Sequence, residues 1–305
     1  MAVDISSIRE LIATLARRHG AGPALHDRAV LIGLVGRGIG GSRSPRMHER
    51  EGERLGLRYT YVLIDFDHHS LSDDALRAVI EEAAAQGFAG LNVTHPFKQS
   101  IVTHLTDLAA DAAAIGAVNT VVFDGRRRIG HNTDSWGFAE SVRQGLGGEH
   151  FETVVQFGAG GGGAAVAHAL LELGTANLDI YDSNTRRATD LADRLTVRFG
   201  RTVVVVSDPV AAIHRAQGAV NATPVGMEKY PGVPFETDAL TSRHWVADIV
   251  YFPAETELLR RARALGCRTL AGTGMAIFQA IKAFELFTGI TPDRDAMAQH
   301  FEAAA

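Results

Sequence analysis

A glycine-rich segment near the middle of the chain constrains the fold more than any other feature. Within QFGAGGGGAAVAHAL (156–170), three glycines have the spacing GxGxxG between an apolar run and a helical pattern. In such turns the first glycine permits the bend, the second lets the backbone approach a pyrophosphate, and the third lets helix and strand pack closely. The pattern predicts a dinucleotide site, and the alternative is a purely structural turn. The predicted cofactor-binding glycines are Gly158, Gly160, Gly161, Gly162 and Gly163.

The second half of the chain alternates short apolar runs with helical stretches around this segment. The strands are expected at 151–160, 178–182, 202–207, 219–224 and 245–251, and helices at 164–174 and 186–200. This order is typical of a doubly wound nucleotide-binding sheet.

The first half shows the same alternation in a separate series. Strands are expected at 29–36, 59–66 and 87–96, with helices at 45–57 and 73–86. We therefore predict an α/β protein with two domains and a boundary near 131–150. The last helices, 275–288 and 294–304, could pack on either half.

Composition excludes several classes of protein. The chain has 305 residues, which suggests about two domains at roughly 150 residues each. A net charge of −5 argues against a general nucleic-acid binder, and no apolar run approaches the roughly 18 residues that span a bilayer. The single cysteine, Cys267, and 13 scattered histidines without an HExxH motif predict no metal site. Residues 3–19 have amphipathic helical spacing interrupted by charge, unlike a secretory signal, so a cytoplasmic location is expected.

Asp182 is the candidate determinant of cofactor choice. It follows Gly158 by 24 positions, at the end of the next apolar run. A carboxylate there accepts hydrogen bonds from the adenosine ribose and repels a 2′-phosphate, which favours NAD over NADP. The nearby Arg186 and Arg187 could neutralise a phosphate, and Asp182 could instead cap the next helix, so both alternatives stay open.

Small polar side chains cluster in three segments of the first half. Open α/β sheets bind ligands at the carboxyl ends of their strands, and hydroxyls and amides without a metal suit a polyhydroxylated substrate. Each serine by itself could be a helix cap. The residues concerned are Ser42, Ser44, Asn92, Thr94, Lys98, Asn119, Thr120, Asn132, Thr133 and Asp134.

Lys98 and Asp134 form the candidate acid–base pair. Only three of the 30 basic residues are lysines, and arginine cannot lose its proton near neutrality. A lysine in a partly desolvated site has a lowered pKa and can take a proton from an alcohol, while an aspartate orients it. The alternative is an exposed lysine beside a turn aspartate.

From about residue 30 to its end the chain resembles the shikimate/quinate dehydrogenases. Eight motifs occur in the family's order: GSRSPRMH, NVTHPFK, GAVNT, NTDSWGF, GAGGGG, NATPVGM, DIVYFPAETELL and GTGMAIFQAIKAFELFTG. The resemblance implies a nicotinamide-dependent oxidoreductase of aromatic (chorismate) biosynthesis that interconverts shikimate and 3-dehydroshikimate. It also implies an N-terminal extension at 1–27, a substrate domain at 28–134 completed by helices from about 276 to 305, and a Rossmann-type domain at 135–275.

The resemblance assigns roles to individual residues. Lys98 and Asp134 are implied as the catalytic pair. The implied substrate residues are Ser42 and Ser44 for the carboxylate, Thr94, Asn119, Tyr251 and Gln279 for the hydroxyls or carboxylate, and Asn92 in support. The implied cofactor residues, besides the glycines, are Asp182, Arg187, Thr223, Pro224, Ile249 and Gly272. The expected partner is a small molecule, with no nucleic acid, membrane or metal, and the expected state is a monomer or homodimer.

Two departures from the family pattern bear on specificity. Many NADP-using members have Asn-Arg-Thr where this chain has Asp182-Ser183-Asn184, which again favours NAD. The stretch Ser42-Arg43-Ser44, without a serine–threonine pair, looks more like a shikimate site than a quinate site. Quinate dehydrogenase or dual activity stays the main alternative. A non-catalytic quinate-pathway sensor, methylenetetrahydrofolate dehydrogenase and glutamyl-tRNA reductase are remote ones.

Overall fold

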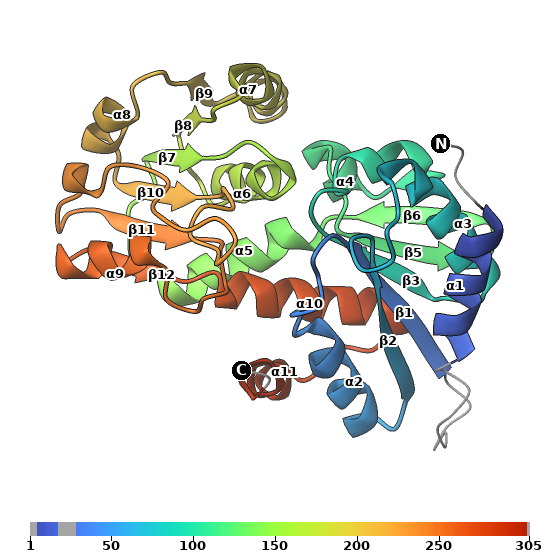
Figure 1. Cartoon of the computed structure of the whole chain (residues 1–305). Coiled ribbons are helices and arrows are strands. Elements are labelled where there is room, and N and C mark those ends of the chain that lie inside the picture. Colours follow the sequence, from blue (N-terminus) through green and yellow to red (C-terminus); the bar gives the residue numbers. More distant parts are fainter. Residues whose placement is uncertain (1–4, 18–28, 304–305) are drawn as a thin grey trace. The chain divides into compact units, whose positions relative to one another are not determined.

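The computed structural model describes residues 5–17 and 29–303 and divides into two compact units (Figure 1). Unit 1 comprises Met1–Thr133 with Ala280–Ala305, and unit 2 comprises Asp134–Gln279. The chain passes from one unit to the other within helix α5 (Thr133–Gly145) and again within helix α10 (Thr273–Thr288).

Unit 1 is built on a six-stranded sheet of order β2-β1-β3-β5-β6-β4. Its strands are β1 (Ala29–Gly36), β2 (Arg58–Asp65), β3 (Gly90–Val93), β4 (Asp107–Leu108), β5 (Thr120–Asp124) and β6 (Arg127–His131). Its other elements are α1 (Ile5–Arg17), α2 (Ser44–Arg54), η2 (Asp73–Ala75), α3 (Leu76–Ala85), η3 (Ser100–His104), α4 (Ala110–Ile115) and α11 (Arg294–Glu302). β5 is antiparallel to both neighbours, and the other pairs are parallel.

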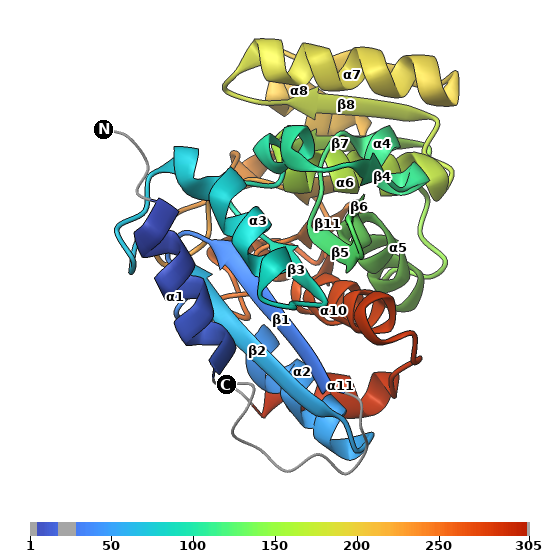
Figure 2. The ribbon, with the colours of Figure 1, turned by 90° about the vertical axis from the view of Figure 1, so that its right-hand side faces the viewer.

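The N-terminal amphipathic pattern forms α1, which lies beside α3 (Figures 1 and 2). Ile8, Ile12 and Leu15 are buried in the core of unit 1, whereas Ile5 faces solvent. Arg9 pairs with Glu82 of α3 at 3.1 Å. The rest of the predicted extension, residues 1–4 and 18–27, lies outside the described residues.

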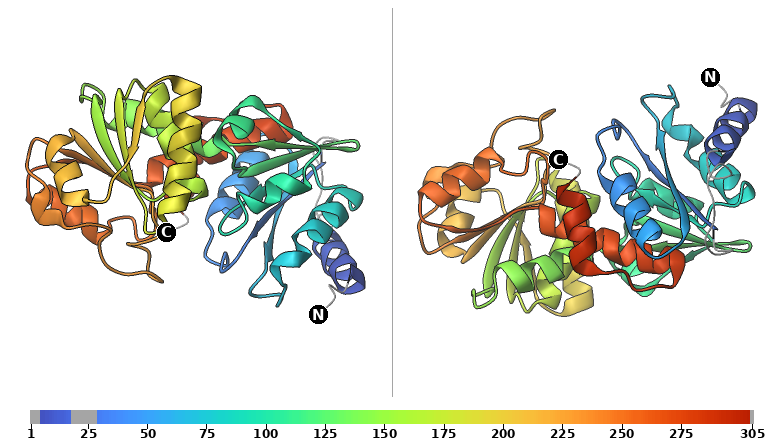
Figure 3. Two further views of the ribbon diagram at one scale, coloured as in Figure 1. Left: turned by 90° about the horizontal axis from the view of Figure 1, so that it is seen from above. Right: turned by 90° about the horizontal axis from the view of Figure 1, so that it is seen from below.

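Unit 2 contains a six-stranded parallel sheet of order β12-β11-β10-β7-β8-β9. The strands are β7 (Thr153–Phe157), β8 (Asn177–Tyr181), β9 (Thr202–Val205), β10 (Gly218–Asn221), β11 (Trp245–Asp248) and β12 (Arg268–Leu270). The other elements are α6 (Gly161–Glu172), α7 (Thr185–Phe199), α8 (Pro209–Arg215), η4 (Thr237–Ala239) and α9 (Glu257–Ala264). Helices lie on both faces of this sheet (Figure 3).

This strand order confirms the doubly wound sheet predicted for the second half. The order reverses between β7 and β10, because β7 is followed in sequence by β8 on one side and β10 lies on its other side. Ligands of such sheets bind outside the carboxyl ends of the strands at this switch point. β7, β10 and β11 are almost wholly buried, as expected for strands covered on both faces.

Two elements differ from the sequence prediction in ways that matter for the site. Strand β3 ends at Val93, well short of residue 96, because the Phe97 N–H bonds to the Thr94 carbonyl at 2.9 Å and turns the chain. Helix α6 begins at Gly161 instead of 164, so glycines form its first turn. Glycine's low helix propensity hid this start from the sequence pattern.

Candidate active site

The carboxyl ends of β1 and β3 are bonded to each other in unit 1. The Thr94 N–H donates to the Val35 carbonyl at 2.9 Å, and the Arg37 N–H donates to the His95 carbonyl at 3.1 Å. A Cβ at Gly36 would lie 2.4 Å from the Thr94 methyl group, so only glycine leaves room there. Thr94, one of the expected substrate residues, is therefore fixed against the end of β1.

Asn92 and Asn119 belong to one buried hydrogen-bond network. The Asn92 amide donates to the Thr120 hydroxyl at 3.0 Å, and Asn92 Oδ1 accepts from the Tyr61 hydroxyl at 3.0 Å. Asn119 Nδ2 donates to Thr133 Oγ1, and its Oδ1 accepts from the Thr133 N–H, each at 2.8 Å. The network links β2, β3, β5 and the start of α5, so these two asparagines have fixed orientations.

Lys98 lies in the turn that follows β3 and is half-buried. Its carbonyl accepts from the Val118 N–H at 2.7 Å. The preceding residue, Phe97, is buried and its ring lies 4.5 Å from that of Phe66. The Lys98 turn is therefore held by an aromatic anchor on one side and by the segment before β5 on the other.

Arg37 holds the same turn from the end of β1. Its guanidinium lies over the rings of Phe66 and Phe97, at 5.7 and 5.9 Å from their centroids. It also pairs with Asp67 at 2.7 Å and Asp73 at 2.5 Å. The hydrogen bonds to Asp73 and Asp67, and to a smaller extent their negative charges, raise the pKa of Arg37.

Asp65 anchors the loop that carries Ser42 and Ser44. Its carboxylate accepts from the backbone N–H groups of Gly38 at 3.0 Å and Ile39 at 2.8 Å. Burial by itself would raise the pKa of Asp65, but these backbone donors outweigh it and lower the pKa.

The two serines lie at the start of α2, but neither is its N-cap. Ser42 Oγ accepts from the Ser44 N–H at 3.3 Å, and Arg43 occupies the N-cap position. The helix-capping alternative is therefore not what the structure shows. Ser42, in the loop that Asp65 anchors, and Ser44, the first residue of α2, are both half-buried.

Asp134 and Gln279 lie where the chain crosses between the units. Asp134 is buried in the first turn of α5, directly after Thr133. A Cβ at Gly137 would lie 2.7 Å from the Gln279 backbone nitrogen, so α5 and α10 pack closely there. Lys98 belongs to unit 1 and Asp134 to unit 2, and their pairing stays a prediction.

The glycine-rich turn of unit 2 has the geometry that a dinucleotide site requires. Gly158 has φ of +101°, and a Cβ there would lie 2.7 Å from the Ala222 carbonyl oxygen. A Cβ at Gly163 would lie 2.3 Å from the Gly158 carbonyl oxygen, so this glycine lets α6 pack onto the turn. A Cβ at Gly160 meets nothing within 4 Å, which leaves the backbone open to a ligand.

Additional contacts hold this turn in place. Gln156 Nε2 donates to the carbonyls of both Gly158 and Gly163 at 2.8 Å. Gly161 is the first residue of α6, so the N–H groups of this first turn have no carbonyl partner within the helix and can bind an anion. The residues present therefore fit a pyrophosphate.

Asp182 follows β8 and contacts the glycine-rich turn directly. Its carboxylate accepts from the Ala159 N–H at 2.6 Å and from the Asn184 N–H at 2.8 Å. The N-cap of α7 is Asn184, which bonds the Arg187 N–H, so Asp182 does not cap that helix.

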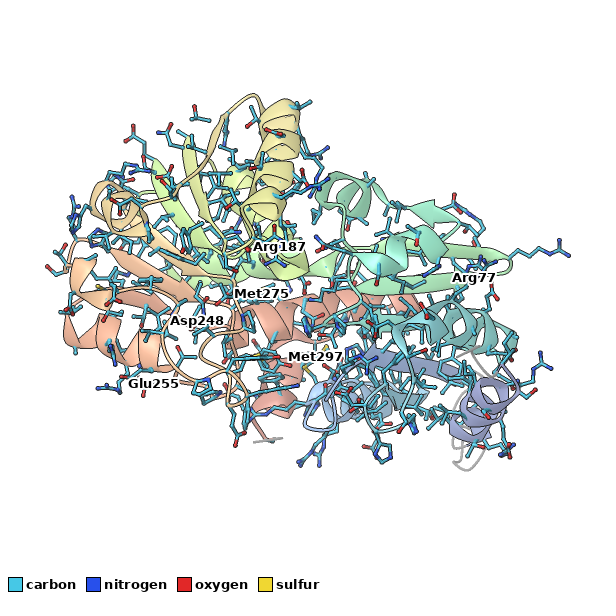
Figure 4. All side chains as sticks on the ribbon, turned by 45° about the horizontal axis from the view of Figure 1, so that its top comes forward. Arg77, Arg187, Asp248, Glu255, Met275 and Met297 are labelled. Carbon is cyan, nitrogen blue, oxygen red and sulfur yellow. The ribbon has the colours of Figure 1, made fainter. Side chains whose placement is uncertain are left out.

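Arg187 takes part in this arrangement through its side chain. Its guanidinium donates to both Asp182 oxygens, at 2.8 and 2.9 Å, from the first turns of α7 (Figure 4). Burial favours a higher pKa for Asp182, but Arg187 and the backbone N–H groups outweigh it and lower the pKa. In this structure the Arg187 guanidinium therefore pairs with the carboxylate of Asp182.

The loops after β10 and β11 carry the remaining expected cofactor residues. Thr223 Oγ1 and the Thr223 N–H donate to Asn221 Oδ1 at 2.7 and 3.0 Å, and Pro224 is exposed beside them. A Cβ at Gly272 would lie 2.4 Å from the Ile249 carbonyl oxygen, so those two residues are in contact. Tyr251, two residues after Ile249, is exposed.

The sequence analysis missed several residues that hold the site. Tyr61, Asp65 and Arg37 support the expected substrate residues, while Asn221 and Asp248 support the expected cofactor loops. Asn221 and Asp248 are polar residues at the carboxyl ends of buried strands, the same pattern that singled out Asn92. Of the residues described, no group of three or more His, Cys, Asp or Glu could hold a metal ion. No described helix is long and apolar enough to cross a membrane.

Comparisons with known proteins identify the family. Residues 34–121 match the model of the shikimate dehydrogenase substrate binding domain, and residues 272–300 match that of the shikimate 5′-dehydrogenase C-terminal domain. The chain is 52% identical over 266 residues to a shikimate dehydrogenase (NADP(+)) of Streptomyces avermitilis, covering 86% of this chain and 91% of the relative. It is 46% identical over 280 residues to a quinate/shikimate dehydrogenase (NAD(+)) of Corynebacterium glutamicum, covering 90% and 98%.

A solved structure agrees with these relatives. Quinate dehydrogenase from Corynebacterium glutamicum in complex with NAD superposes with a TM-score of 0.84 at 45% sequence identity, covering 91% of this chain and all of that one. Together with the site geometry, these likenesses assign the fold and the chemistry to one group of enzymes. The chain belongs to the shikimate dehydrogenase family of nicotinamide-dependent oxidoreductases that act on a CH–OH group.

Proposed function

We propose that the protein interconverts shikimate and 3-dehydroshikimate with NAD as cofactor. Unit 1 is proposed as the substrate domain and unit 2 as the cofactor domain. The polar network at the ends of β1, β3 and β5 supports the first role, and the glycine-rich turn supports the second. The cytoplasmic location and the monomeric or dimeric state stay predictions.

Asp182 is the observation that carries the choice of NAD. Its carboxylate lies at the carboxyl end of β8, fixed to the turn through the Ala159 N–H at 2.6 Å. A ribose can donate its hydroxyls to this carboxylate, whereas a 2′-phosphate would meet its negative charge. Three hydrogen bonds, from Nε and Nη2, hold the Arg187 guanidinium on Asp182, so turning it fully toward a phosphate would break all three.

The proposed mechanism assigns the proton to Lys98 and the orientation to Asp134. When bound, the nicotinamide supplies the hydride acceptor for oxidation. Lys98 removes the proton from the C3 hydroxyl of shikimate, and in reduction protonated Lys98 returns it. Asp134 orients Lys98 and accepts a hydrogen bond from the adjacent substrate hydroxyl.

Binding of the substrate is proposed to use the remaining polar residues. Ser42 and Ser44 hold its carboxylate. Thr94, Asn119, Tyr251 and Gln279 bind its hydroxyls or carboxylate, and Asn92 supports Asn119 through Thr120. The hydrogen bonds within this network fix the donors before substrate arrives, which reduces the reorganisation needed for hydride transfer.

Use of NADP is the second candidate, and the nearness of Arg187 to the cofactor end of β8 favours it. The relatives named above include both cofactor types. Quinate is the other alternative substrate within the family, because it differs from shikimate by a hydroxyl at C1.

Initial rates in a two-by-two comparison test the proposal. Shikimate or quinate is combined with NAD+ or NADP+, and the proposal expects the highest kcat/KM for shikimate with NAD+. A strong preference for NADP+ would mean that Arg186 or Arg187 overrides the charge of Asp182. The Arg187→Ala variant is the control: it should lose any NADP+ activity and keep its NAD+ activity within a few-fold.

A further inference from the structure

A buried carboxylate outside the proposed catalytic pair lies at the end of β11. Asp248 is only 2% exposed. Its Oδ1 accepts from Asn221 Nδ2 and from the Val250 N–H, each at 2.9 Å, and its Oδ2 accepts from Thr256 Oγ1 at 2.7 Å. These three hydrogen-bond donors, an amide, a backbone N–H and a hydroxyl, are all neutral.

These bonds join two loops through one pair of side chains. Asn221 organises residues 222–226, because its amide also donates to the Val225 carbonyl at 2.9 Å. Asp248 organises residues 249–256 through Val250 and Thr256. The hydrogen bond between Asn221 and Asp248 therefore couples the two loops, and a movement of one loop would disturb the side chain that holds the other. Asp248 is labelled in Figure 4.

The strand order indicates which end of the cofactor these loops face. The glycine-rich turn and Asp182 follow β7 and β8, so the adenosine half belongs on that side of the switch point. β10 and β11 form the opposite half and therefore face the nicotinamide. This step rests on the function proposed above.

The Asp248 carboxylate carries a buried charge among neutral partners. Burial raises the pKa of Asp248 to about 6, so the side chain is ionised at pH 8, and its hydrogen-bond partners within the described residues are all uncharged. An asparagine would keep the same shape, and the Thr256 hydroxyl could rotate to accept from it. The cost of a buried charge is thus avoidable by a single isosteric substitution.

We propose that Asp248 positions the two loops and that its negative charge favours the oxidised nicotinamide over the reduced one. The oxidised ring carries a positive charge and the reduced ring is neutral, so a fixed negative charge acts on the difference between them. Low dielectric around the buried carboxylate extends the reach of its field.

Binding of the two cofactor forms to the Asp248→Asn variant tests the proposal. Dissociation constants for oxidised and reduced cofactor are measured by calorimetry at pH 8, with no second substrate, using whichever of the NAD or NADP pairs binds the wild type. The expected result is a roughly 3- to 10-fold weaker affinity for the oxidised form and less than a twofold change for the reduced form.

A matched control is the Asp179→Asn variant. Asp179 is also a buried carboxylate of unit 2, but it lies within β8 and pairs with Arg215 at 2.6 Å. Its substitution should leave the ratio of the two dissociation constants unchanged. If the Asp248→Asn variant does not fold, as judged by circular dichroism, the two dissociation constants of the wild type are compared at pH 8 and pH 5, because protonation of Asp248, whose pKa burial raises to about 6, removes the same charge and carries the same expectation.

Two outcomes would overturn the inference in distinguishable ways. Equal weakening of both forms, or no change in either, would show that the charge of Asp248 does not distinguish redox states, and the proposed function would stand. A wild-type protein that binds neither cofactor pair would overturn the proposed function together with the inference.

Discussion

Lys98 owes its position to the residues around it. Phe97 is buried against Phe66, and Arg37 lies over both rings, so the turn that presents Lys98 has little freedom. Cation–π and ion-pair contacts of this kind each contribute modestly, yet together they fix a short turn that has no regular secondary structure. The proposed general base is thus placed by a rigid local scaffold.

The Lys98→Ala variant should lose turnover while it keeps its fold. We expect kcat to fall by roughly 10²- to 10⁴-fold, the usual contribution of a general acid–base group. Cofactor affinity, measured separately by calorimetry, should stay within about twofold because the glycine-rich turn belongs to unit 2. A drop in kcat below tenfold would remove Lys98 from the mechanism.

The buried His48 makes the free energy of unfolding of unit 1 depend on pH. Burial lowers its pKa to about 3, while its Nδ1 lies 3.0 Å from the Tyr59 hydroxyl. The folded state therefore binds fewer protons than the unfolded state, and stability is lost as pH falls below the unfolded value of about 6.5. Between pH 7 and pH 5 this group should cost about 2 kcal/mol.

Urea unfolding of the wild type and the His48→Gln variant checks this pH dependence. Glutamine can keep the bond to Tyr59 but does not titrate. The wild type should lose about 2 kcal/mol more than the variant between pH 7 and pH 5. Identical losses in both proteins would mean that His48 is accessible to protons in the folded state.

At the level of secondary-structure elements, different glycines of the glycine-rich turn serve folding and cofactor binding. Gly163 is needed for α6 to pack on the turn, whereas Gly160 opens onto free space. The same substitution at the two positions therefore has different physical consequences. A methyl group at position 163 meets backbone at 2.3 Å, and at position 160 it meets no protein atom within 4 Å.

The Gly163→Ala and Gly160→Ala variants should consequently differ in kind. We expect Gly163→Ala to lower the thermal midpoint by several degrees, because the backbone must shift. Gly160→Ala should melt like the wild type but bind cofactor at least tenfold more weakly, because its methyl group occupies the space that a pyrophosphate would need. Normal cofactor affinity in the Gly160→Ala variant would contradict the proposed pyrophosphate position.

Helix α1 provides a second comparison between matched positions. Ile12 is fully buried against the core of unit 1, and Ile5 on the same helix is 55% exposed. Ile12→Ala should destabilise the protein by about 2–4 kcal/mol through lost burial and a cavity. Ile5→Ala should change the free energy of unfolding by less than about 0.5 kcal/mol, as urea unfolding would reveal. Equal effects would indicate that α1 does not dock as described.

At the scale of the whole molecule, the chain consists of two units with separate sheets and separate cores. One hydrophobic cluster belongs to unit 1 and another to unit 2. Each unit can therefore respond to its own ligand, since a ligand stabilises the part of the protein that binds it.

Hydrogen exchange with each ligand alone tests the proposed division of labour. Cofactor alone should slow exchange in residues 157–163 and at the end of β8. Shikimate alone should slow exchange around Thr94 and Asn119. Protection by shikimate confined to unit 2 would overturn the assignment of unit 1 as the substrate domain.

Much of the architecture could be predicted because it depends on local patterns. The spacing of apolar residues predicted most strands and helices, and the steric requirements of GxGxxG predicted the turn. The hairpin of β5 and β6 was not predicted, because polar residues flank both strands in the sequence. Apart from each other, these strands pair only with the short strands β3 and β4. The start of α6 escaped because glycines form its first turn.

Local sequence patterns were enough to predict the two α/β units, the glycine turn and the residue types available to a site. These follow from side-chain periodicity and backbone sterics, which act over a few residues. Three contacts emerge only when the whole chain is folded: Asp182 bonds Ala159, Asn221 bonds Asp248, and Arg37 covers Phe97. Those partners are 23, 27 and 60 residues apart, and the register of parallel strands brings them together at one edge of each sheet. That register depends on the packing of each unit as a whole.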